Sequence, residues 1–513
     1  MTVPTTLSAM FPQAVTAFEM LLTDLAGDAA MAMTHADLEA HIATHGRGVL
    51  RAAMQDQLDL RALREARRDD VVDAAGTRYS SVESNHTRPL TTILGEVQVG
   101  RKAYRKKGHP NLYPTDAELN LPREQYSHGL RKLAAIEATR GSYEETVAAI
   151  ARATGQTLGK RQVEELVQRA AADFEAFYTA TERPDVPPEA VLVLSVDGKG
   201  VIMRPEALRP ATAKAAAKSQ PKLATRVSPG EKRDRKRMAE VGAVYDVRPV
   251  IRTPEDVLRS KAPKEPASPA GGEAAATQAP PAAPVAENKW VTASVVDNVA
   301  TVVEQVFNEA EQRDPTHARE WIALVDGNND QINQIEAQAQ ARGIKVTMHI
   351  DCIHWFEYLW LAAWCFFAKG DAEAEAWVRT QALAILRGNA SVVAAAMGRK
   401  ATVLGLNAER RKAVDKCVQY LLNKKDYLDY PTALARGWPI GTGVIEGACR
   451  YLVQDRMDRT GARWGLRGAE SVLKLRALMS NGDFDVYWAY HCAREHDRVH
   501  RARYAPEKTS RVA

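Results

Sequence analysis

Apolar side chains recur at helical spacing in the first part of the chain. The members of two such repeats are Phe18, Leu21, Leu22 and Leu25, followed by Leu50, Met54 and Leu58. This pattern predicts a helical N-terminal region over residues 1–85, whose surface is heavily charged between residues 61 and 70. Either these helices form a solvated pair, or their outer faces support dimerisation or contact with a DNA end.

The period changes to two over residues 90–104, where apolar and polar side chains alternate around Gly95. Alternation around a glycine turn predicts a β-hairpin. A basic stretch with Tyr104 and Tyr113 nearby continues the hairpin, and cations interleaved with aromatic rings suit a phosphate backbone. A plain charged hairpin is the alternative interpretation.

Apolar residues again recur at helical spacing over residues 128–180, and the pattern of helices and turn is that of a helix-turn-helix. Ser142 and Glu145 have the spacing of a capping box, and Gly155 suits the turn between two helices. The second helix would offer its first residues to the edges of DNA bases, although a generic helical hairpin fits the same pattern. Together with the β-hairpin, this segment predicts a DNA-binding region over residues 86–185.

Short continuous apolar runs between residues 190 and 350 predict the strands of an α/β core. The five runs lie at 191–200, 241–247, 290–296, 321–326 and 344–350. The first three suit an antiparallel meander once an insertion over 205–288 is set aside, and two strand–helix units follow. This order favours an RNase H-like core of mixed α+β class over residues 190–370. A doubly wound nucleotide-binding sheet fits less well, because neither GxGxxG nor GxxxxGK[ST] occurs.

The insertion over 205–288 is basic at first and then low in complexity. Its segment 261–284 consists largely of Pro and Ala, a composition that cannot bury a core and predicts disorder. Beyond the core, residues 371–437 read as an all-helical insertion. Residues 438–513 then predict a region that opens with a helix bearing Glu446 and ends as a basic helical C-terminus.

Composition narrows the class of protein. The chain has 513 residues, of which 45% are hydrophobic, so several globular domains are expected. The most apolar segment, 350–368, contains Asp351 and Glu357, and the N-terminus has no basic and apolar leader. These features predict a cytoplasmic protein without a membrane partner. The five cysteines form no CxxC pair, which predicts neither a disulfide framework nor a cysteine zinc site.

Three acidic residues carry the candidate chemistry. Asp197 and Asp326 each end an apolar run, and Glu446 opens a helical stretch after a Gly-Thr-Gly turn. Two strand-end aspartates and a helix glutamate can share a pair of divalent cations, the arrangement of two-metal phosphodiester chemistry. Asp351 also ends a strand and is a possible further ligand. His354 is either a packed helix histidine or a residue near the scissile phosphate.

Basic side chains suggest where DNA would bind, because the net charge of +5 permits such binding without requiring it. The candidate DNA contacts are Arg101, Lys102, Arg105, Lys160, Arg161, Gln162, Lys232, Arg233, Arg235, Lys236, Arg237, Arg450, Arg456 and Arg463. A solvated loop remains the alternative for residues 231–237. Arg450, one turn after Glu446, could instead steady that carboxylate. Trp464 suits either base stacking or a core position.

Four segments carry a resemblance to a known family: Ser-Val-Asp-Gly-Lys-Gly (195–200), Leu-Val-Asp-Gly-Asn (324–328), Ile-Asp-Cys-Ile-His-Trp-Phe-Glu-Tyr-Leu-Trp (350–360) and the Gly-Thr-Gly-Val-Ile-Glu block (441–457). Over about residues 85–480 the chain resembles bacterial insertion-sequence transposases of the DDE type, closest to the ISKra and ISLre groups. The long C-terminal block is specific, whereas any one Asp-Gly is not. The cysteine-rich knuckle that relatives often carry after the hairpin is missing, so no zinc is expected.

The resemblance implies an RNase H-like fold with an all-helical insertion and the triad Asp197, Asp326 and Glu446. These residues would hold two Mg²⁺ ions, with Mn²⁺ as a substitute, and Asp197 would bridge both. The implied partners are the terminal inverted repeats of the element, target DNA and further copies of the chain, as a homodimer or higher multimer in a bacterial nucleoid. A DNA nuclease or resolvase on the same fold, and a DNA-binding regulator with an inactive catalytic domain, are the rival hypotheses.

Overall fold

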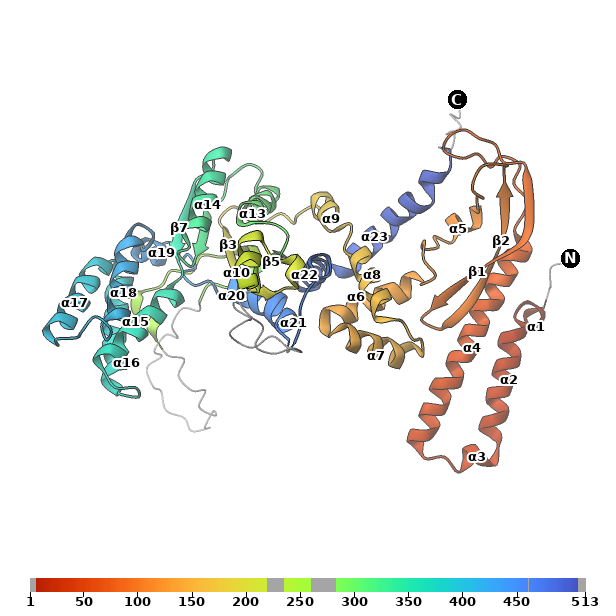
Figure 1. Ribbon diagram of the computed structural model, residues 1–513, viewed down its shortest axis with the longest axis horizontal. Helices are drawn as coiled ribbons and strands as arrows, with labels where there is room; N and C mark the ends of the chain where they lie inside the picture. Colours follow the sequence, from red (N-terminus) through yellow and green to blue (C-terminus); the bar gives the residue numbers. More distant parts are fainter. Residues whose placement is uncertain (1–5, 219–234, 260–282, 460, 506–513) are drawn as a thin grey trace, which may run out of the picture. The chain divides into compact units, whose positions relative to one another are not determined.

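A computed structural model describes residues 6–218, 235–259, 283–459 and 461–505 (Figure 1). Lys232, Arg233 and most of the low-complexity segment lie outside these residues. The chain divides into two compact units, the first formed by Met1–Ala180 with Gly482–Ala513 and the second by Thr181–Asn481. Helices and two β-sheets make up the described residues, so the predicted mixed α and β class is confirmed.

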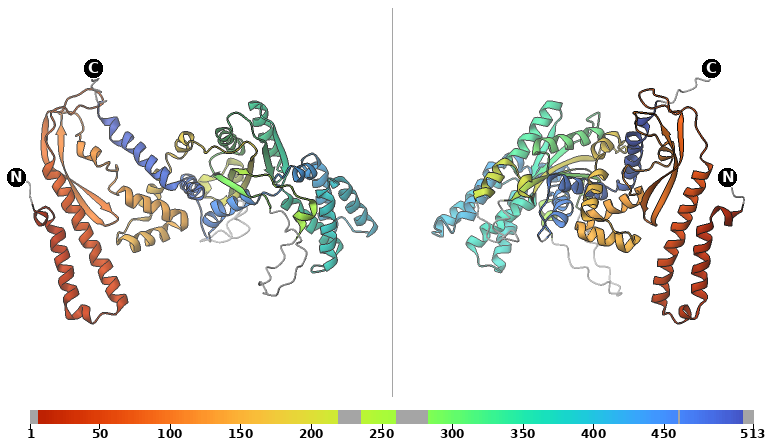
Figure 2. Two further views of the ribbon diagram at one scale, coloured as in Figure 1. Left: turned by 180° about the vertical axis from the view of Figure 1, so that it is seen from behind. Right: turned by 45° about the vertical axis from the view of Figure 1, so that its right-hand side comes forward.

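The first unit opens with a helical hairpin, seen at its full length in Figure 2. Its long arms are α2 (Pro12–Ala26) and α4 (His35–Arg64), and short helices α1 (Leu7–Met10) and α3 (Asp28–Met31) flank the first arm. Thr34 begins α4 by accepting a hydrogen bond from the Asp37 amide. The predicted helical N-terminal region is therefore a pair of helices side by side.

A two-stranded sheet packs against the hairpin. Strands β1 (Ser81–Thr92) and β2 (Gly95–Arg105) are antiparallel, and Gly95 at their turn has a φ of +136°, which glycine adopts readily. The sequence predicts a β-hairpin here, but its first strand begins earlier than the alternating pattern. An apolar cluster of strand and neighbouring residues holds the sheet on α4, and it consists of Leu58, Leu90, Val97, Val99 and Leu121.

The helices that follow are α5 (Pro114–Glu118), α6 (His128–Arg140), α7 (Tyr143–Thr154), α8 (Lys160–Ala170) and α9 (Phe174–Ala180). Ser142 and Glu145 form the predicted capping box at the start of α7. Gly155 ends α7 in the left-handed conformation with a φ of +70°, so the predicted turn residue is confirmed. Helices α7 and α8 thus provide a helix, a tight turn and a second helix.

The last helix, α23 (Phe484–Val499), belongs to this first unit. Asp173 accepts hydrogen bonds from both Arg498 and His491 of α23, and the side chains of Asp173 and His491 are buried. The sequence predicts one region over 438–513, but the chain passes from one unit to the other at residue 481. Buried charge pairs between distant segments decide this assignment, and the helical pattern of α23 contains no sign of them.

Buried histidines make the stability of this unit pH-dependent. Burial lowers the pKa of His128, His491 and His500 below the ordinary value of 6.5. A lowered pKa means that the folded unit binds fewer protons than the unfolded chain, so its stability is fully present above pH 6.5 and falls as pH drops through the folded pKa values. We expect the midpoint of urea unfolding, followed by circular dichroism, to fall on acidification below that pH.

His500→Gln tests this expectation, because its amide can replace the imidazole in the 2.7 Å contact with the Leu121 carbonyl oxygen without titrating. It should flatten the pH dependence. The matched control is His35→Gln at a solvated position with a side chain 92% exposed, which should leave the dependence unchanged. An equal effect of the two substitutions would contradict the assignment to buried histidines.

The second unit contains a five-stranded sheet with the spatial order β5-β4-β3-β6-β7. The strands are β3 (Val191–Ile202), β4 (Lys236–Val247), β5 (Ala286–Ser294), β6 (Trp321–Val325) and β7 (Val346–Ile350). Strands β3, β4 and β5 form an antiparallel meander, whereas β6 and β7 run parallel to β3. All five coincide with apolar runs in the sequence, because strands buried on both faces need such runs.

Helices surround and extend this sheet. Those near the strands are α10 (Pro210–Lys218), α12 (Pro254–Leu258), α13 (Val299–Arg313) and α14 (Asn329–Arg342). The helical block after β7 comprises α15 (Cys352–Phe366), α16 (Ala372–Leu386), α17 (Ala390–Val403), α18 (Lys412–Asn423) and α19 (Tyr430–Ala435). The chain then returns through α20 (Gly443–Ala448), the π-helix η3 (Cys449–Gln454), α21 (Asp455–Met457) and α22 (Leu466–Asn481). No described helix is long and apolar enough to cross a membrane.

Different helices pack against the two faces of the sheet. Gly242 in β4 faces α13, because a Cβ there would meet side chains of that helix. Gly242 pairs with Val196 of β3, so the next residue, Asp197, points to the opposite face. On that face Cys449 of η3 lies against Asp197. The returning helices therefore lie on the side of the sheet to which Asp197 points.

Candidate active site

Three aspartates lie at equivalent positions on the neighbouring strands β3, β6 and β7 of the second unit's sheet. Strand β3 pairs with β6 so that Ser195 lies beside Leu324, and β6 pairs with β7 so that Val325 lies beside Ile350. Continuing these registers places Asp197, Asp326 and Asp351 in one row across three neighbouring strands. Asp326 and Asp351 directly follow β6 and β7, but Asp197 lies within β3, so its predicted position at a strand end is wrong. Parallel strands are about 4.8 Å apart, and registered residues point to the same face. The row is therefore an acidic edge at the carboxyl ends of β6 and β7.

Asp197 is half-buried and hydrogen-bonded on both carboxylate oxygens. Its Oδ1 accepts from the Gly198 amide at 2.6 Å, and its Oδ2 accepts from the Cys449 thiol at 3.3 Å. Burial raises its pKa, and the negative charge of Asp326 adds to this effect. At neutral pH the ionised carboxylate is therefore destabilised by its surroundings, as expected of a group that needs a cation nearby.

Asp326 lies in the turn between β6 and α14, and several segments fix this turn. Its Oδ1 accepts from the Asn328 amide at 2.8 Å, while its backbone carbonyl accepts from the Tyr420 hydroxyl of α18 at 2.8 Å. With its amide nitrogen turned toward the site, buried Gln331 donates to Asp326 Oδ1 at 3.3 Å and to the Val196 carbonyl oxygen at 3.2 Å. Gln331 therefore ties the Asp326 turn to the strand that carries Asp197.

Asp351 is buried and serves as an anchor for the segment before α20. Its carboxylate accepts from the Thr442 amide at 3.2 Å, from the Thr442 hydroxyl, and from the Ile353 amide at 3.0 Å. A backbone bond from Cys352 to the Ile440 carbonyl oxygen, 2.9 Å long, lies beside these contacts. Asp351 thus starts α15 as its N-cap and also holds the Gly-Thr-Gly turn at the end of β7.

Glu446 is exposed on α20 and lies near the aspartates. Burial is the largest cause of its raised pKa. The negative charge of Asp351 and a hydrogen bond with Asp351 raise the pKa further, and the charges of Glu357 and Asp197 add smaller effects. Two anchors hold its helix, namely Thr442 on Asp351 before it and Cys449 on Asp197 after it. A π-helical turn closely follows Glu446, and such turns often occur at functional sites. The predicted triad therefore converges on one region of the second unit.

The carboxylates suit a divalent cation by their chemistry, because Mg²⁺ prefers oxygen ligands and these groups repel one another without a cation. The described residues nevertheless contain no group of three His, Cys, Asp or Glu side chains already arranged to hold a metal ion. In this structure Asp351 accepts a hydrogen bond from Thr442, and both carboxylate oxygens of Asp197 accept hydrogen bonds from within the protein. Ion binding would exchange some of these hydrogen bonds for coordination.

We predict that Asp351→Ala destabilises the second unit by about 1–3 kcal/mol, because it leaves buried donors of Thr442 and Ile353 without an acceptor. Asp351→Asn keeps a carbonyl acceptor and adds an amide donor for the Thr442 hydroxyl, so it should retain most of the stability. Thermal unfolding measures the first effect, and hydrogen exchange over residues 441–448 should be faster in the Ala variant alone. Equal exchange in both variants would contradict the anchoring role.

Four neighbours of the triad were not foreseen from the sequence: Glu240, Gln331, Tyr420 and Cys449. Glu240 in β4 pairs with Gly198, and burial together with the charge of Asp197 raises its pKa although Arg209 opposes this. The spacing between Glu446 and Cys449, close to one helical turn, could have indicated that both share a helix face. The other three come from separate elements, and only the fold brings them near the acidic edge.

The basic residues predicted to contact DNA in the second unit have unequal environments. Arg450 and Arg463 have side chains open to solvent, whereas Arg456 is 2% exposed and stacks on the ring of Trp464. Trp464 is itself buried and donates to the Met457 carbonyl oxygen at 3.1 Å, so it occupies a core position. The buried stacking of Arg456 corrects its predicted role at the DNA surface. Arg450 lies 3.8 Å from Asp455, and no contact with Glu446 is seen among the described residues.

The basic residues 235–237, around the start of β4, also differ in their exposure to solvent. Lys236 is exposed, and Arg235 is half-buried with its Nε unbonded among the described residues. Arg237 donates to the backbone carbonyl oxygens of Val295 and Ala207, and therefore joins segments within the protein. Of the described part of this run, Lys236 alone has the solvated side chain that a DNA contact needs.

In the first unit, the predicted contacts on the β-hairpin are partly structural. Arg101 pairs with Asp116 and lies over the ring of Tyr113 at 3.9 Å, with only 11% of its side chain exposed. Arg101 is therefore a packing residue, which corrects its predicted role. Lys102 donates to the Glu65 carbonyl oxygen, and Arg105 pairs with Glu83 while staying half-exposed.

The start of α8 keeps the solvent exposure expected of a recognition helix. Lys160 pairs with Glu144, and Arg161 is 90% exposed on its side chain and 3.3 Å from Glu165. Gln162 caps its own helix, because its Oε1 accepts from the Gly159 amide at 2.9 Å. Exposed ion pairs of this kind contribute little and exchange readily for phosphate. Arg161 is therefore the best placed of the three for an external contact.

His354, predicted to be either packed or near a phosphate, is half-buried on α15. Its ring lies edge-on to Tyr358 with a centroid distance of 5.3 Å, and Tyr420 lies at 5.8 Å. Because the hydroxyl of Tyr420 donates to the backbone carbonyl of Asp326, the ring of Tyr420 lies between His354 and the Asp326 turn. It helps to pack the wall of the site, and its ring shows no polar partner within the described part of the chain.

Fold and site together define a mixed α/β unit with an acidic edge at its strand ends. No protein-family model matches the chain. A stretch of 125 residues is 28% identical to a Streptococcus gallolyticus protein described as "UPF0236 protein in vanSb 3'region". The aligned stretch spans 23% of this chain and 26% of that protein. The likeness is therefore local and covers about a quarter of either chain.

Proposed function

We propose that the second unit is an RNase H-like catalytic domain and that the chain is a DNA transposase of the DDE type. The observation that carries the proposal is the row of Asp197 and Asp326 on adjacent strands, with the Glu446 helix held beside it through Cys449. The strand order, an antiparallel meander followed by two parallel strands, supports it. The helical block between β7 and α20 stands where such a domain would carry an all-helical insertion.

Asp197, Asp326 and Glu446 would hold the Mg²⁺ ions, with Asp351 as a possible further ligand. When bound, a pair of such ions activates the attacking oxygen and stabilises the leaving oxygen of a phosphodiester. The protein holds these ligands in position, since Gln331 and Tyr420 fix the Asp326 turn and Asp351 fixes the turn before Glu446. Precise placement of this kind supports catalysis because the geometry is set before substrate binds.

The first unit would recognise DNA ends. The helix, glycine turn and helix formed by α7 and α8 support this role, together with the exposed side chains of Lys160 and Arg161. Terminal inverted repeats and target DNA are the proposed partners. An enzyme with these substrates would work on the nucleoid in the bacterial cytoplasm.

The test is an assay of cleavage and strand transfer on labelled element-end DNA with Mg²⁺ or Mn²⁺. A DDE transposase should cut the end and join it to target DNA. Cutting without joining would instead indicate a nuclease or resolvase of the same fold. Tight DNA binding that is independent of metal and leads to no cutting would indicate the regulator. The variant Arg161→Ala should weaken binding of the end sequence, while Arg399→Ala, at a surface position of the second unit, should not.

A further inference from the structure

Two histidines lie one helical turn apart near the start of α4, in the first unit. The rings of His41 and His45 have centroids 4.2 Å apart, and their planes are tilted by 39°. Side chains four positions apart in a helix are neighbours on one face, so both imidazoles project from the same side of α4. The helix thus presents two ring-nitrogen donors at the spacing that lets one metal ion contact both.

One of these rings lacks a partner. His41 is half-buried, and its Nε2 is shielded from solvent without a hydrogen bond to any described residue. A shielded polar atom without a partner costs about 1–3 kcal/mol. His45 is exposed, so its ring can turn and admit an ion beside His41. An ion bound between the rings would supply the missing partner of His41.

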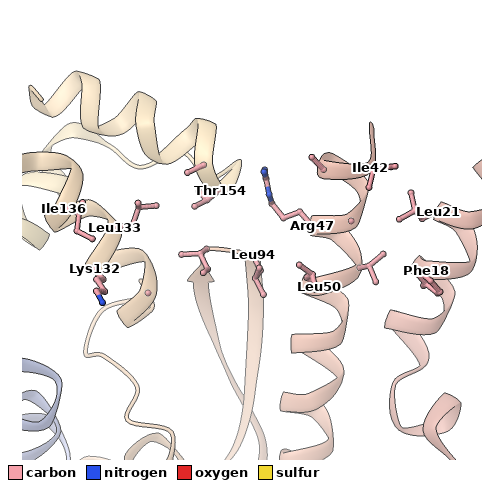
Figure 3. A pocket seen from close by; sticks show the side chains of 16 residues that line it. Phe18, Leu21, Ile42, Arg47, Leu50, Leu94, Lys132, Leu133, Ile136 and Thr154 are labelled. Carbon is pink, nitrogen blue, oxygen red and sulfur yellow. The ribbon is translucent and has the colours of Figure 1, made fainter. Parts of the chain in front are cut away.

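The helix that carries the pair faces an apolar groove with a neighbouring stripe of residues. Ile42, Gly46 and Leu50 line this groove, whose volume is about 780 Å³ (Figure 3). His41 and His45 precede Ile42 and Gly46 by one position, which is about 100° around a helix, and neither histidine lines the groove. The histidine pair therefore lies beside the groove, on a stripe that remains accessible through His45.

The donor atoms indicate which kind of ion fits. Metal–nitrogen bonds of about 2.0–2.1 Å place the centroids of two imidazoles on one ion about 5 Å apart, so a small rotation of the exposed His45 ring suffices. Imidazole nitrogen suits late transition-metal ions, whereas Mg²⁺ prefers oxygen. Asp37 lies one turn before His41, but its Oδ2 already accepts from the Thr34 hydroxyl at 2.6 Å. The described residues contain no group of three such side chains arranged for a metal, so two protein ligands are assigned.

We propose that His41 and His45 form a chelating site for a late divalent transition-metal ion, Cu²⁺ or Ni²⁺, with water in the remaining positions. Among such ions Cu²⁺ binds nitrogen donors most tightly. The chelate requires the two rings to be one turn apart, so the ion binds the folded helix and stabilises the first turns of α4. The inference rests on the first unit alone and does not depend on the activity proposed for the acidic edge.

Titration of the untagged full chain with Cu²⁺, followed by electron paramagnetic resonance, tests the proposal. Excess Mg²⁺ is present to fill the carboxylate sites. The bound Cu²⁺ should show coupling to imidazole nitrogens, and His41→Gln or His45→Gln should each raise its dissociation constant at least ~10-fold. His35→Gln is the matched control, because His35 is 92% exposed on the same helix but six positions before His41, on another side. It should leave the affinity unchanged.

Hydrogen exchange gives a second readout of the same site. Ni²⁺ should slow exchange over residues 35–48 in the native chain but not in His45→Gln, and circular dichroism of each variant controls for folding. Equal affinities in the native chain, His41→Gln and His45→Gln would indicate an adventitious ion only and would overturn the proposal, as would an equal loss in His35→Gln. Cu²⁺ binding through the pair in a chain that cuts no DNA would count against the proposed function alone.

Discussion

Asp197→Asn is expected to lower the metal-dependent DNA cleavage proposed for the second unit about 10³-fold or more while leaving the fold more stable. Metal-held charge stabilisation is worth several kcal/mol in the transition state, and each ~1.4 kcal/mol is a factor of ten in rate. The gain in stability follows from the raised pKa of Asp197: burial and the charge of Asp326 disfavour its ionised form, and an amide removes that cost. Loss of activity with a rise in melting temperature identifies a functional carboxylate.

Two comparisons make this result decisive. Asp330→Asn alters an exposed acid in the first turn of α14, close in sequence to Asp326, and should change neither activity nor stability. Glu240→Gln removes the carboxylate that pairs with Gly198, the residue after Asp197, and that therefore points to the opposite face of the sheet, so it should keep the activity. Full activity in Asp197→Asn would contradict the role of Asp197 as a ligand. DNA binding should be the same in all three variants.

The second large effect is expected in the first unit, where Arg131→Met should lower the free energy of unfolding by about 3–5 kcal/mol. The side chain of Arg131 is fully buried, 2.6 Å from Glu495 of α23 and 3.1 Å from Glu124. Without the guanidinium, two carboxylates in a poorly hydrated environment lose their closest counter-charge and keep only more distant partners, Arg169 at 3.6 Å from Glu124 and His491 at 3.4 Å from Glu495. Helix α23 should then separate from the unit first, as increased hydrogen exchange over residues 484–499 would show.

The adjacent residue provides the control. Lys132 forms a 2.6 Å pair with Asp485, whose side chain is 83% exposed, and solvent screens such pairs. Lys132→Met should therefore change the stability by no more than about 1 kcal/mol. Adding Glu495→Leu to Arg131→Met should recover part of the loss, because it removes one of the stranded charges. If both single variants behaved alike, the buried charge network would not be what holds α23 in place.

Local patterns in the sequence were sufficient to locate the strands, although several strands begin or end at other residues than predicted. The five apolar runs became the five strands, since burial on both faces requires continuous apolar side chains. Ser142, Glu145 and Gly155 could be assigned because a cap and a left-handed turn depend on residues a few positions apart. The position of Asp326 directly after a strand followed in the same way, because it ends an apolar run, whereas β3 continues past Asp197 to Ile202 and Asp197 is not at a strand end.

Which distant groups meet depends on the packing of the folded chain. Packing brings Thr442 within hydrogen-bond distance of Asp351 and Cys449 within hydrogen-bond distance of Asp197. It also joins α23 to the first unit through the hydrogen bond between His491 and Asp173. It likewise placed Arg101 and Arg456 inside the protein, although their neighbours in the sequence read as a basic surface.

This difference arises from the range of the interactions. Periodicity, caps and turns arise between residues a few positions apart, so the amino-acid sequence was enough to predict the helices, the strands and the candidate acidic residues on them. A hydrogen bond or a buried ion pair between segments far apart in the sequence depends on packing, and the identity of either residue alone does not specify its partner. The choice between an exposed contact and an internal one was therefore made by the fold.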